Sequence, residues 1–141
     1  MSRESPDRED ALRAALGDDP HGRALGIELL ELVPGRCRAA LRLDDRHLNF
    51  QGNAHGGVVF SLADYAFAGA CNAAGEPAVA LSVSIQFLVA VPPGTRLVAD
   101  ARVTRQGRRA GFYQMTVSAD DGTLVATCQA VAHRPGQTLQ S

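Results

Sequence analysis

One long apolar segment constrains the fold more than any other part of this 141-residue chain. Between Ala54 and Ala74 the only side chain charged at neutral pH is that of Asp64. Apolar residues would lie on nearly every side of a helix formed by this segment, so the helix should be buried. Gly75-Glu76-Pro77 predicts where it ends.

The segments on either side of this helix have the alternating pattern of strands. Residues 26–32 and 36–43 precede it, and residues 78–91, 97–105, 112–118 and 123–133 follow it. In the second strand Arg36, Arg38 and Arg42 share the face opposite Cys37 and Ala39. This order lacks the βαβ alternation of a parallel sheet, so we predict an α+β fold in which an antiparallel sheet wraps around one helix.

The length suits one domain, and a hydrophobic content of 45% is enough for a core. We expect residues 1–20 to be a flexible segment with a short helix from about Glu9 to Leu16. Residues 21–134 would form the single domain and residues 135–141 a tail.

Composition argues against several classes of protein. A net charge of −1 gives no general attraction to nucleic acid or to an anionic membrane. The N-terminus has no apolar region of a secretory signal, and no apolar run approaches the roughly 20 residues of a membrane span. We therefore expect a soluble, cytoplasmic protein.

Metal chemistry has little support in the sequence. The cysteines are far apart and lie among apolar residues, which predicts buried thiols rather than a zinc site: Cys37, Cys71 and Cys128. The other histidines have no ligand spacing with His55: His21, His47 and His133. We expect no metal and no redox cofactor.

Asp64 is the strongest candidate for chemistry. No Lys or Arg occurs between Arg46 and Arg96, so Asp64 has no cation close in sequence. A buried carboxylate without a partner is costly, and burial would raise its pKa and make it a stronger base when ionised. The alternative is a structural aspartate that hydrogen-bonds to backbone or serine groups.

His55-Gly56-Gly57 stands at the start of the predicted helix, where backbone N–H groups lack partners. Such a site suits a carbonyl oxygen that becomes negative in a transition state, although small residues also allow tight helix–sheet contact. Asp64 lies eight residues after Gly56, about 12 Å along a helix. One carbonyl cannot reach both groups of one helix, so joint action requires two helices, most simply antiparallel in a symmetric dimer.

Other side chains have both a functional and a structural interpretation. The Asn49 amide can donate to a carbonyl or hold a water, or it can shape a turn. Ser61 has no G-x-S-x-G context for a nucleophile, while Ser82 or Ser84 could orient a water or simply pack. Three arginines around a turn could bind phosphate or form a solvated hairpin tip: Arg105, Arg108 and Arg109.

Taken together, the motifs resemble those of the hotdog-fold thioesterases, in particular the phenylacetyl-CoA thioesterase (PaaI-like) branch. The similarity runs from about Gly26 to Arg134. It is carried by Asn49-x-x-Gly52-x-x-His55-Gly56-Gly57, Leu62-Ala63-Asp64-x-Ala66-Phe67, Ala70-Cys71-Asn72 and Ala132-His133-Arg134.

The resemblance implies a role for each matched position. The Gly56 N–H would polarise the thioester carbonyl, and Asn49 would help to hold that carbonyl or the water. Asp64 of the partner subunit would act as general base or nucleophile, and His55 would support the loop. Gly57, Ser82 and the three arginines would contact the substrate, the arginines through the coenzyme A phosphates. Family members are dimers or tetramers with coenzyme A across the subunit boundary.

The expected reaction is hydrolysis of an arylacetyl-CoA, phenylacetyl-CoA or a ring-hydroxylated form, as in phenylacetate degradation. Phe60, Tyr65 and Phe67 could line the acyl pocket or pack in the core. A thioesterase for medium-chain or other aromatic acyl-CoA is an alternative, as is a non-catalytic acyl-CoA binding module. A hotdog dehydratase fits less well, because no suitable Asp/His pairing is evident.

Overall fold

The computed structural model describes residues 4–135 of the chain. Two helices, α1 (Glu4–Gly17) and α2 (Pro20–Leu25), precede the strands β1 (Glu28–Val33) and β2 (Arg36–Arg42). A short 3-10 turn, η1 (Asp45–His47), leads to the central helix α3 (Gly56–Ala73). Four strands follow: β3 (Val79–Phe87), β4 (Arg96–Gln106), β5 (Ala110–Ala119) and β6 (Leu124–His133).

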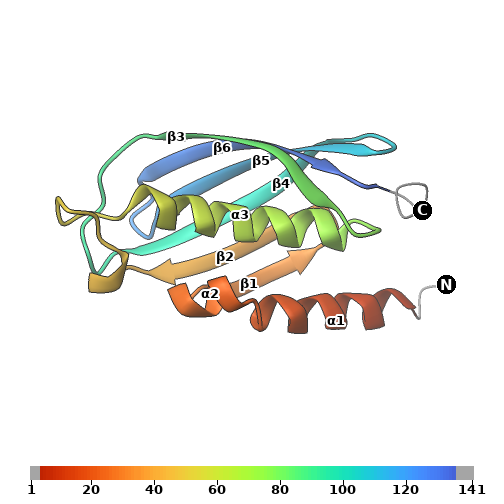
Figure 1. Cartoon of the computed structure of the whole chain (residues 1–141), viewed down its shortest axis with the longest axis horizontal. Helices are drawn as coiled ribbons and strands as arrows, with labels where there is room; N and C mark the ends of the chain where they lie inside the picture. The colour runs from red at the N-terminus through yellow and green to blue at the C-terminus, as the bar shows by residue number, and fades with distance from the viewer. Residues whose placement is uncertain (1–3, 136–141) are drawn as a thin grey trace.

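The six strands form one antiparallel sheet in the order β1-β2-β4-β5-β6-β3. The helix α3 lies along one face of this sheet, and α1 and α2 lie beside it at the β1 edge (Figure 1). The predicted α+β fold, an antiparallel sheet wrapped around a central helix, is therefore confirmed.

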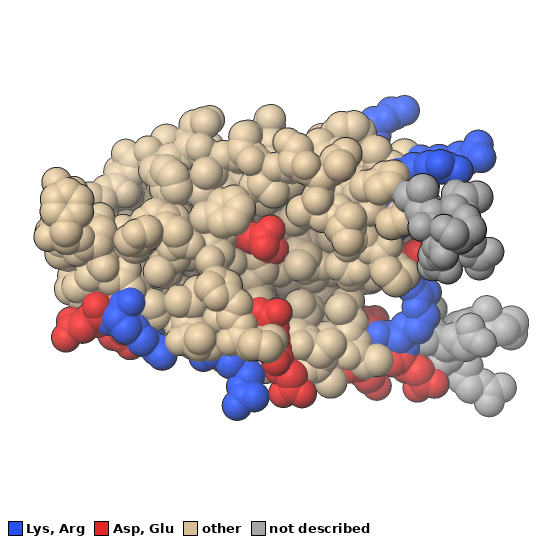
Figure 2. All heavy atoms as spheres, viewed as in Figure 1, with Lys and Arg blue, Asp and Glu red and all other residues tan. Residues whose placement is uncertain are grey.

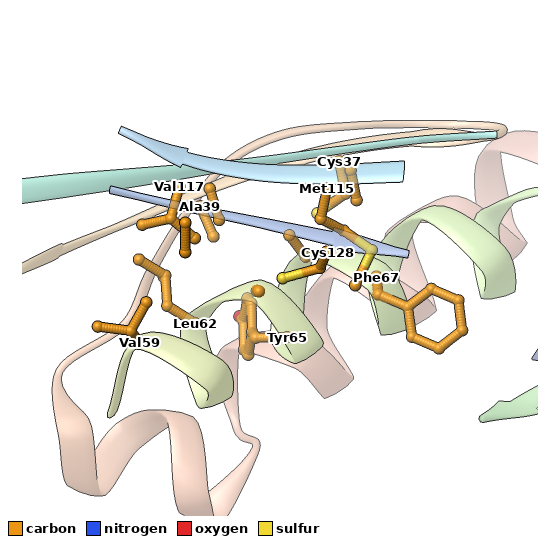
Figure 3. Close-up of a cluster of buried hydrophobic side chains, with 14 of the residues drawn as sticks. Cys37, Ala39, Val59, Leu62, Tyr65, Phe67, Met115, Val117 and Cys128 are labelled. Carbon is orange, nitrogen blue, oxygen red and sulfur yellow. The ribbon is translucent and has the colours of Figure 1, made fainter. Parts of the chain in front are cut away.

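Small and aromatic side chains set how closely α3 approaches the sheet. A Cβ at Gly69 would lie 2.6 Å from the Cys37 sulfur on β2, so only glycine fits there. The Phe67 ring meets Tyr113 of β5 edge to face, with ring centroids 5.4 Å apart. Figure 3 shows side chains from α3, β2, β5 and β6 meeting in this one core.

The alternation predicted for β2 is present. Cys37, Ala39 and Leu41 are buried under α3, whereas Arg36 and Arg38 lie on the outer face of the sheet. There the arginines pair with Asp100 of β4, whose nearest carboxylate oxygen is 3.1 Å from an Arg36 nitrogen.

The N-terminal region contains more helix than the sequence predicts. The expected short helix is present but begins at Glu4, and α2 was not predicted. Asp19 caps α2 by accepting a 2.8 Å hydrogen bond from the Gly22 N–H, and Pro20 occupies the first helical position. The predicted domain limits stay predictions, and the tail from residue 136 lies outside the described residues.

The strand β3 ends at Phe87, four residues earlier than predicted. Residues 88–91 leave the strand direction, and the Val91 carbonyl accepts a hydrogen bond from Ala54 just before α3. The apolar run therefore continues as a loop beside the start of the central helix.

All three cysteines are buried and unpaired, as predicted. Burial raises the pKa of Cys37 to about 12 and the pKa values of Cys71 and Cys128 to about 11. Within residues 4–135, no helix combines the length and the apolar character needed to cross a membrane.

Candidate active site

His55 organises the start of α3. Its backbone is extended (φ −67°, ψ 135°), and its Nδ1 accepts a 2.8 Å hydrogen bond from the Gly57 N–H. Val58 and Val59 donate to the His55 carbonyl. Among the described residues, the Gly56 N–H has no hydrogen-bond partner. His55 thus accepts hydrogen bonds from the N–H groups of Gly57, Val58 and Val59, whereas the Gly56 N–H has no acceptor among the described residues.

Asn49 shapes the loop in front of this helix. Its Oδ1 accepts from the Gln51 and Asn53 N–H groups, at 2.9 and 3.2 Å, and its own N–H donates to the Asn53 carbonyl. The amide oxygen is therefore occupied in the turn. The Asn49 NH₂ donates to no described residue, so it remains available to a ligand.

A cavity of about 350 Å³ opens at the N-terminus of α3. Asn49 and Gly56 lie on its wall, and Phe87, Leu88 and Val89 supply apolar surface. A Cβ at Gly56 would lie 3.3 Å from the Phe87 ring, so glycine permits a close approach to the free amide. The site combines unpaired N–H donors with an apolar wall, which suits a polarised carbonyl carrying an apolar group.

Asp64 lies on the only face of α3 that the chain itself leaves partly open, within the described residues. The sequence predicted a helix that is buried on nearly every side. This prediction is wrong for one stripe of α3, whose residues are only half-buried: Phe60, Ser61, Asp64 and Ala68. The Asp64 carboxylate makes no hydrogen bond with a described residue. Its pKa is raised, mainly because burial disfavours the charged form.

The surface around this stripe carries little charge. Figure 2 shows that the face over α3 and β3 is mostly uncharged, whereas acidic and basic side chains gather along the α1 and α2 edge. Among the described residues, no Lys or Arg contributes to the pKa of Asp64.

The structure brings Asn49, His55, Gly56 and Gly57 together at one end of α3 but leaves Asp64 more than two turns along the same helix. Eight residues correspond to about 12 Å. Within one chain, the Asp64 carboxylate and the Gly56 N–H therefore lie too far apart to act on the same carbonyl group.

The remaining predicted residues lie elsewhere. Ser82 and Ser84 share a cavity with Gln114 and Gln129 on the outer face of the sheet, away from α3. The exposed residues Arg105, Arg108 and Arg109 surround the β4–β5 turn, which lies near the C-terminus of α3. Arg134 connects the β4–β5 turn to the end of α3. Its backbone N–H donates to the Arg109 carbonyl, and its Nη2 donates to the Cys71 carbonyl.

Two of the aromatic residues belong to the core. Phe67 packs on Tyr113, and the buried Tyr65 donates from its hydroxyl to the Leu16 carbonyl, so neither lines the cavity. Phe60 is half-buried on the open stripe of α3.

Sequence reasoning missed the contribution of α2. Asp19 and His21 lie close enough to Asp64 to affect its pKa, Asp19 raising it and His21 lowering it. The signal was present, because Asp-Pro is a helix start with the cap at Asp19 and proline at the first helical position.

Comparison with known proteins identifies the family. Residues 51–126 match the model of the thioesterase superfamily, a span that contains the His55-Gly56-Gly57 turn and Asp64. The chain is 36% identical over 122 residues to the acyl-coenzyme A thioesterase PaaI of Escherichia coli, covering 86% of this chain and 87% of that one. The chain belongs to the thioesterase superfamily. As a member of this superfamily it is a thioester hydrolase.

Several solved structures share the fold. The PaaI protein of the Escherichia coli phenylacetic acid degradation operon superposes with a TM-score of 0.86 at 33% identity, covering 96% of each chain. A variant of the phenylacetic acid degradation protein PaaI from Thermus thermophilus gives 0.80 at 39% identity, over 82% of this chain and 99% of that one. A Streptococcus mutans protein bound to acetyl CoA gives 0.73 at 27% identity, over 76% and 86%. The hotdog fold is therefore confirmed.

Proposed function

We propose that this acyl-CoA thioesterase hydrolyses an arylacetyl-CoA, phenylacetyl-CoA or its ring-hydroxylated form, to the acid and free coenzyme A. The observation that carries the proposal is the Gly56 N–H, which has no partner among the described residues and lies on the wall of a cavity with both polar and apolar lining. The similarity to PaaI proteins of phenylacetic acid degradation supports the substrate.

The Gly56 N–H and the Asn49 NH₂ would bind the thioester carbonyl oxygen and stabilise the negative charge that develops on it. Asp64 would supply the second element of the reaction. It either takes the proton from an attacking water or attacks the carbonyl carbon itself. In the water route a C–O bond forms between the water oxygen and the carbonyl carbon as the C–S bond breaks. In the nucleophilic route the C–O bond forms to Asp64, and a water then hydrolyses the resulting anhydride to release the acid and restore the carboxylate. In both routes the thiolate of coenzyme A leaves and takes up a proton that comes from the water. Single turnover in ¹⁸O-water distinguishes the routes.

Two copies of the chain would complete one site. Within residues 4–135, the strand β3 pairs only with β6, so no described strand covers its other edge. It contains no charged residue or proline, and Val79, Leu81 and Phe87 are more than half exposed. Such an edge is suited to pairing with another strand. Antiparallel pairing of two β3 strands about a twofold axis would also set the two α3 helices antiparallel, bringing Asp64 of one copy toward Gly56 of the other.

The same arrangement gives the arginines a role. Arg105, Arg108 and Arg109 are near the C-terminal end of α3, far from Gly56 of their own chain. In an antiparallel dimer, the arginines of one copy would lie toward the cavity of the other. They would bind the phosphates of coenzyme A, which then crosses the subunit boundary. The test compares the KM of wild type and Arg108→Gln for an acyl-CoA and for a truncated thioester that lacks the nucleotide. Arg108→Gln should raise KM for the acyl-CoA and leave KM for the truncated thioester unchanged.

A tetramer would form on the outer face of the sheet. Uncharged polar side chains surround a cavity there, and Phe112 nearby is 43% exposed. Ser82 would contribute to this contact or to the substrate site of a neighbouring copy. Sedimentation of the purified protein gives the number of copies. We also propose that the protein acts in the cytoplasm, where acyl-CoA substrates are available.

The decisive experiment is a panel of acyl-CoA substrates with free thiol as the readout. Arylacetyl-CoA should have the highest kcat/KM, and a preference for straight medium chains would contradict the proposed specificity. Asp64→Asn should abolish turnover while retaining substrate binding. If this variant hydrolyses acyl-CoA at the wild-type rate, the assigned role is wrong. If the wild type binds acyl-CoA without hydrolysing it, the chain is a binding module.

A further inference from the structure

The helix α2 places a histidine against the open stripe of α3. The Nε2 of His21 and the hydroxyl oxygen of Ser61 are 2.9 Å apart, which is a hydrogen bond. Ser61 lies three residues before Asp64, on the same face of the helix. Side chains of an α-helix lean toward its N-terminus, so the Asp64 carboxylate lies over the turn that carries Ser61. The imidazole is therefore tied to the place where the carboxylate lies.

Packing fixes the position of α2, the helix that carries this imidazole. Gly22, the next residue on α2, lies so close to Tyr65 of α3 that an added Cβ would be 2.9 Å from its ring. The Tyr65 hydroxyl donates a 2.9 Å hydrogen bond to the Leu16 carbonyl at the end of α1. Asp19 caps the start of α2. These contacts dock α2 on α3 at one defined position.

The charged groups of the described residues that act on Asp64 both come from this docked segment. Asp19 raises the pKa of Asp64 and His21 lowers it, while burial is the largest cause of the raised value. On α3 itself, Asp64 contributes to the raised pKa of Cys71. The strands packed against α3 contribute no charged group that acts on Asp64.

We propose that His21 is a positioning residue for Asp64: hydrogen-bonded to Ser61 and carried by the docked helix α2, its imidazole is held near the carboxylate and favours the ionised form. This inference rests on the proposed role of Asp64. The ionised, active form of Asp64 would then persist to a lower pH than burial alone permits.

Three variants on and next to α2 separate this role from simple structural support. His21→Gln can keep the hydrogen bond to Ser61 but carries no charge at any pH. Asp19→Asn removes the opposing charge, and asparagine is an equally good helix cap. Arg23→Gln is the control, because it removes a positive charge from the same helix and Arg23 does not act on Asp64.

Two readouts apply to each variant: the pH profile of kcat/KM, and the ¹³C NMR titration of the Asp64 carboxyl group, assigned by its absence in Asp64→Asn. In His21→Gln the acidic limb should move to higher pH, lowering kcat/KM there about threefold relative to the plateau. In Asp19→Asn it should move to lower pH. Arg23→Gln should match the wild type.

The outcomes discriminate clearly. Equal profiles and equal carboxyl titrations for His21→Gln and Arg23→Gln would overturn the proposal. A shift of Asp19→Asn in the same direction as His21→Gln would indicate loss of α2 docking and would also overturn it. The NMR titration does not depend on turnover. Full activity of Asp64→Asn therefore defeats the proposed function, whereas an unmoved carboxyl titration in His21→Gln defeats only this inference.

Discussion

Replacing Gly56 with proline would remove one hydrogen-bond donor from the candidate site and little else. Proline has no N–H and is well suited to the first position of a helix, where Gly56 stands. A residue before proline must be extended, and His55 already is, with φ −67° and ψ 135°. The Gly56 N–H donates to no described residue, so the fold loses no hydrogen bond.

Gly56→Ala is the matched control. Both variants add a Cβ at the place where it would lie 3.3 Å from the Phe87 ring, but alanine keeps the N–H. The ratio of their rates therefore isolates the donor. Losing one donor of this kind costs about 10²- to 10³-fold in kcat, or roughly 3–4 kcal/mol of transition-state stabilisation.

The assay is steady-state hydrolysis of phenylacetyl-CoA, with thermal unfolding to confirm that both variants fold. Gly56→Pro should lose kcat while KM changes much less, because the oxyanion contact strengthens only in the transition state. If the two variants hydrolyse the substrate within threefold of each other, the Gly56 amide is not the oxyanion donor.

Three further predictions follow from the same structure. A 1:1 mixture of Asp64→Asn and Gly56→Pro chains, reassembled together, should recover about a quarter of wild-type activity if each site takes one group from each copy, and none if a site lies within one chain. Because folding raises the pKa of Asp64, stability should fall as pH rises above the ordinary aspartate value of about 3.9. Asp64→Asn should then melt at a higher temperature than wild type at pH 7 and flatten this dependence, and a lower melting temperature would contradict the cause assigned. Arg134→Leu should cost about 2–4 kcal/mol of unfolding free energy, because the buried guanidinium holds the Cys71 carbonyl at the end of α3, while the exposed Arg109→Leu should cost little.

Much of the fold is predictable because its strongest patterns are local. The apolar segment around Asp64 specifies one helix, and the alternation in residues 36–43 specifies one strand and the face that it buries. The end of β3 was harder to predict, since residues 88–91 remain apolar after the strand stops. Their apolar character reflects the wall of a cavity instead of the face of a sheet, and periodicity cannot separate the two.

The candidate site was predictable where function and capping share one motif. The His55 cap and the Asn49 turn follow from hydrogen-bonding rules for residues close in sequence. The pairing of His21 with Ser61 joins residues 40 apart and depends on how α2 docks, which no local rule contains. Nor could the sequence indicate that Ser82 points away from α3, because a bulge next to it shifts the register of β3 against β6.

The three sequestered cysteines also have a practical consequence at the bench. With each thiol enclosed and its pKa raised to about 11 or 12, the folded protein presents almost no thiolate to an aromatic disulfide reagent. Colour that develops during turnover then reports released coenzyme A alone. A slow rise in colour without substrate would instead measure unfolding, because unfolding exposes the buried thiols. The same assay therefore reports both the activity and the unfolding of the enzyme.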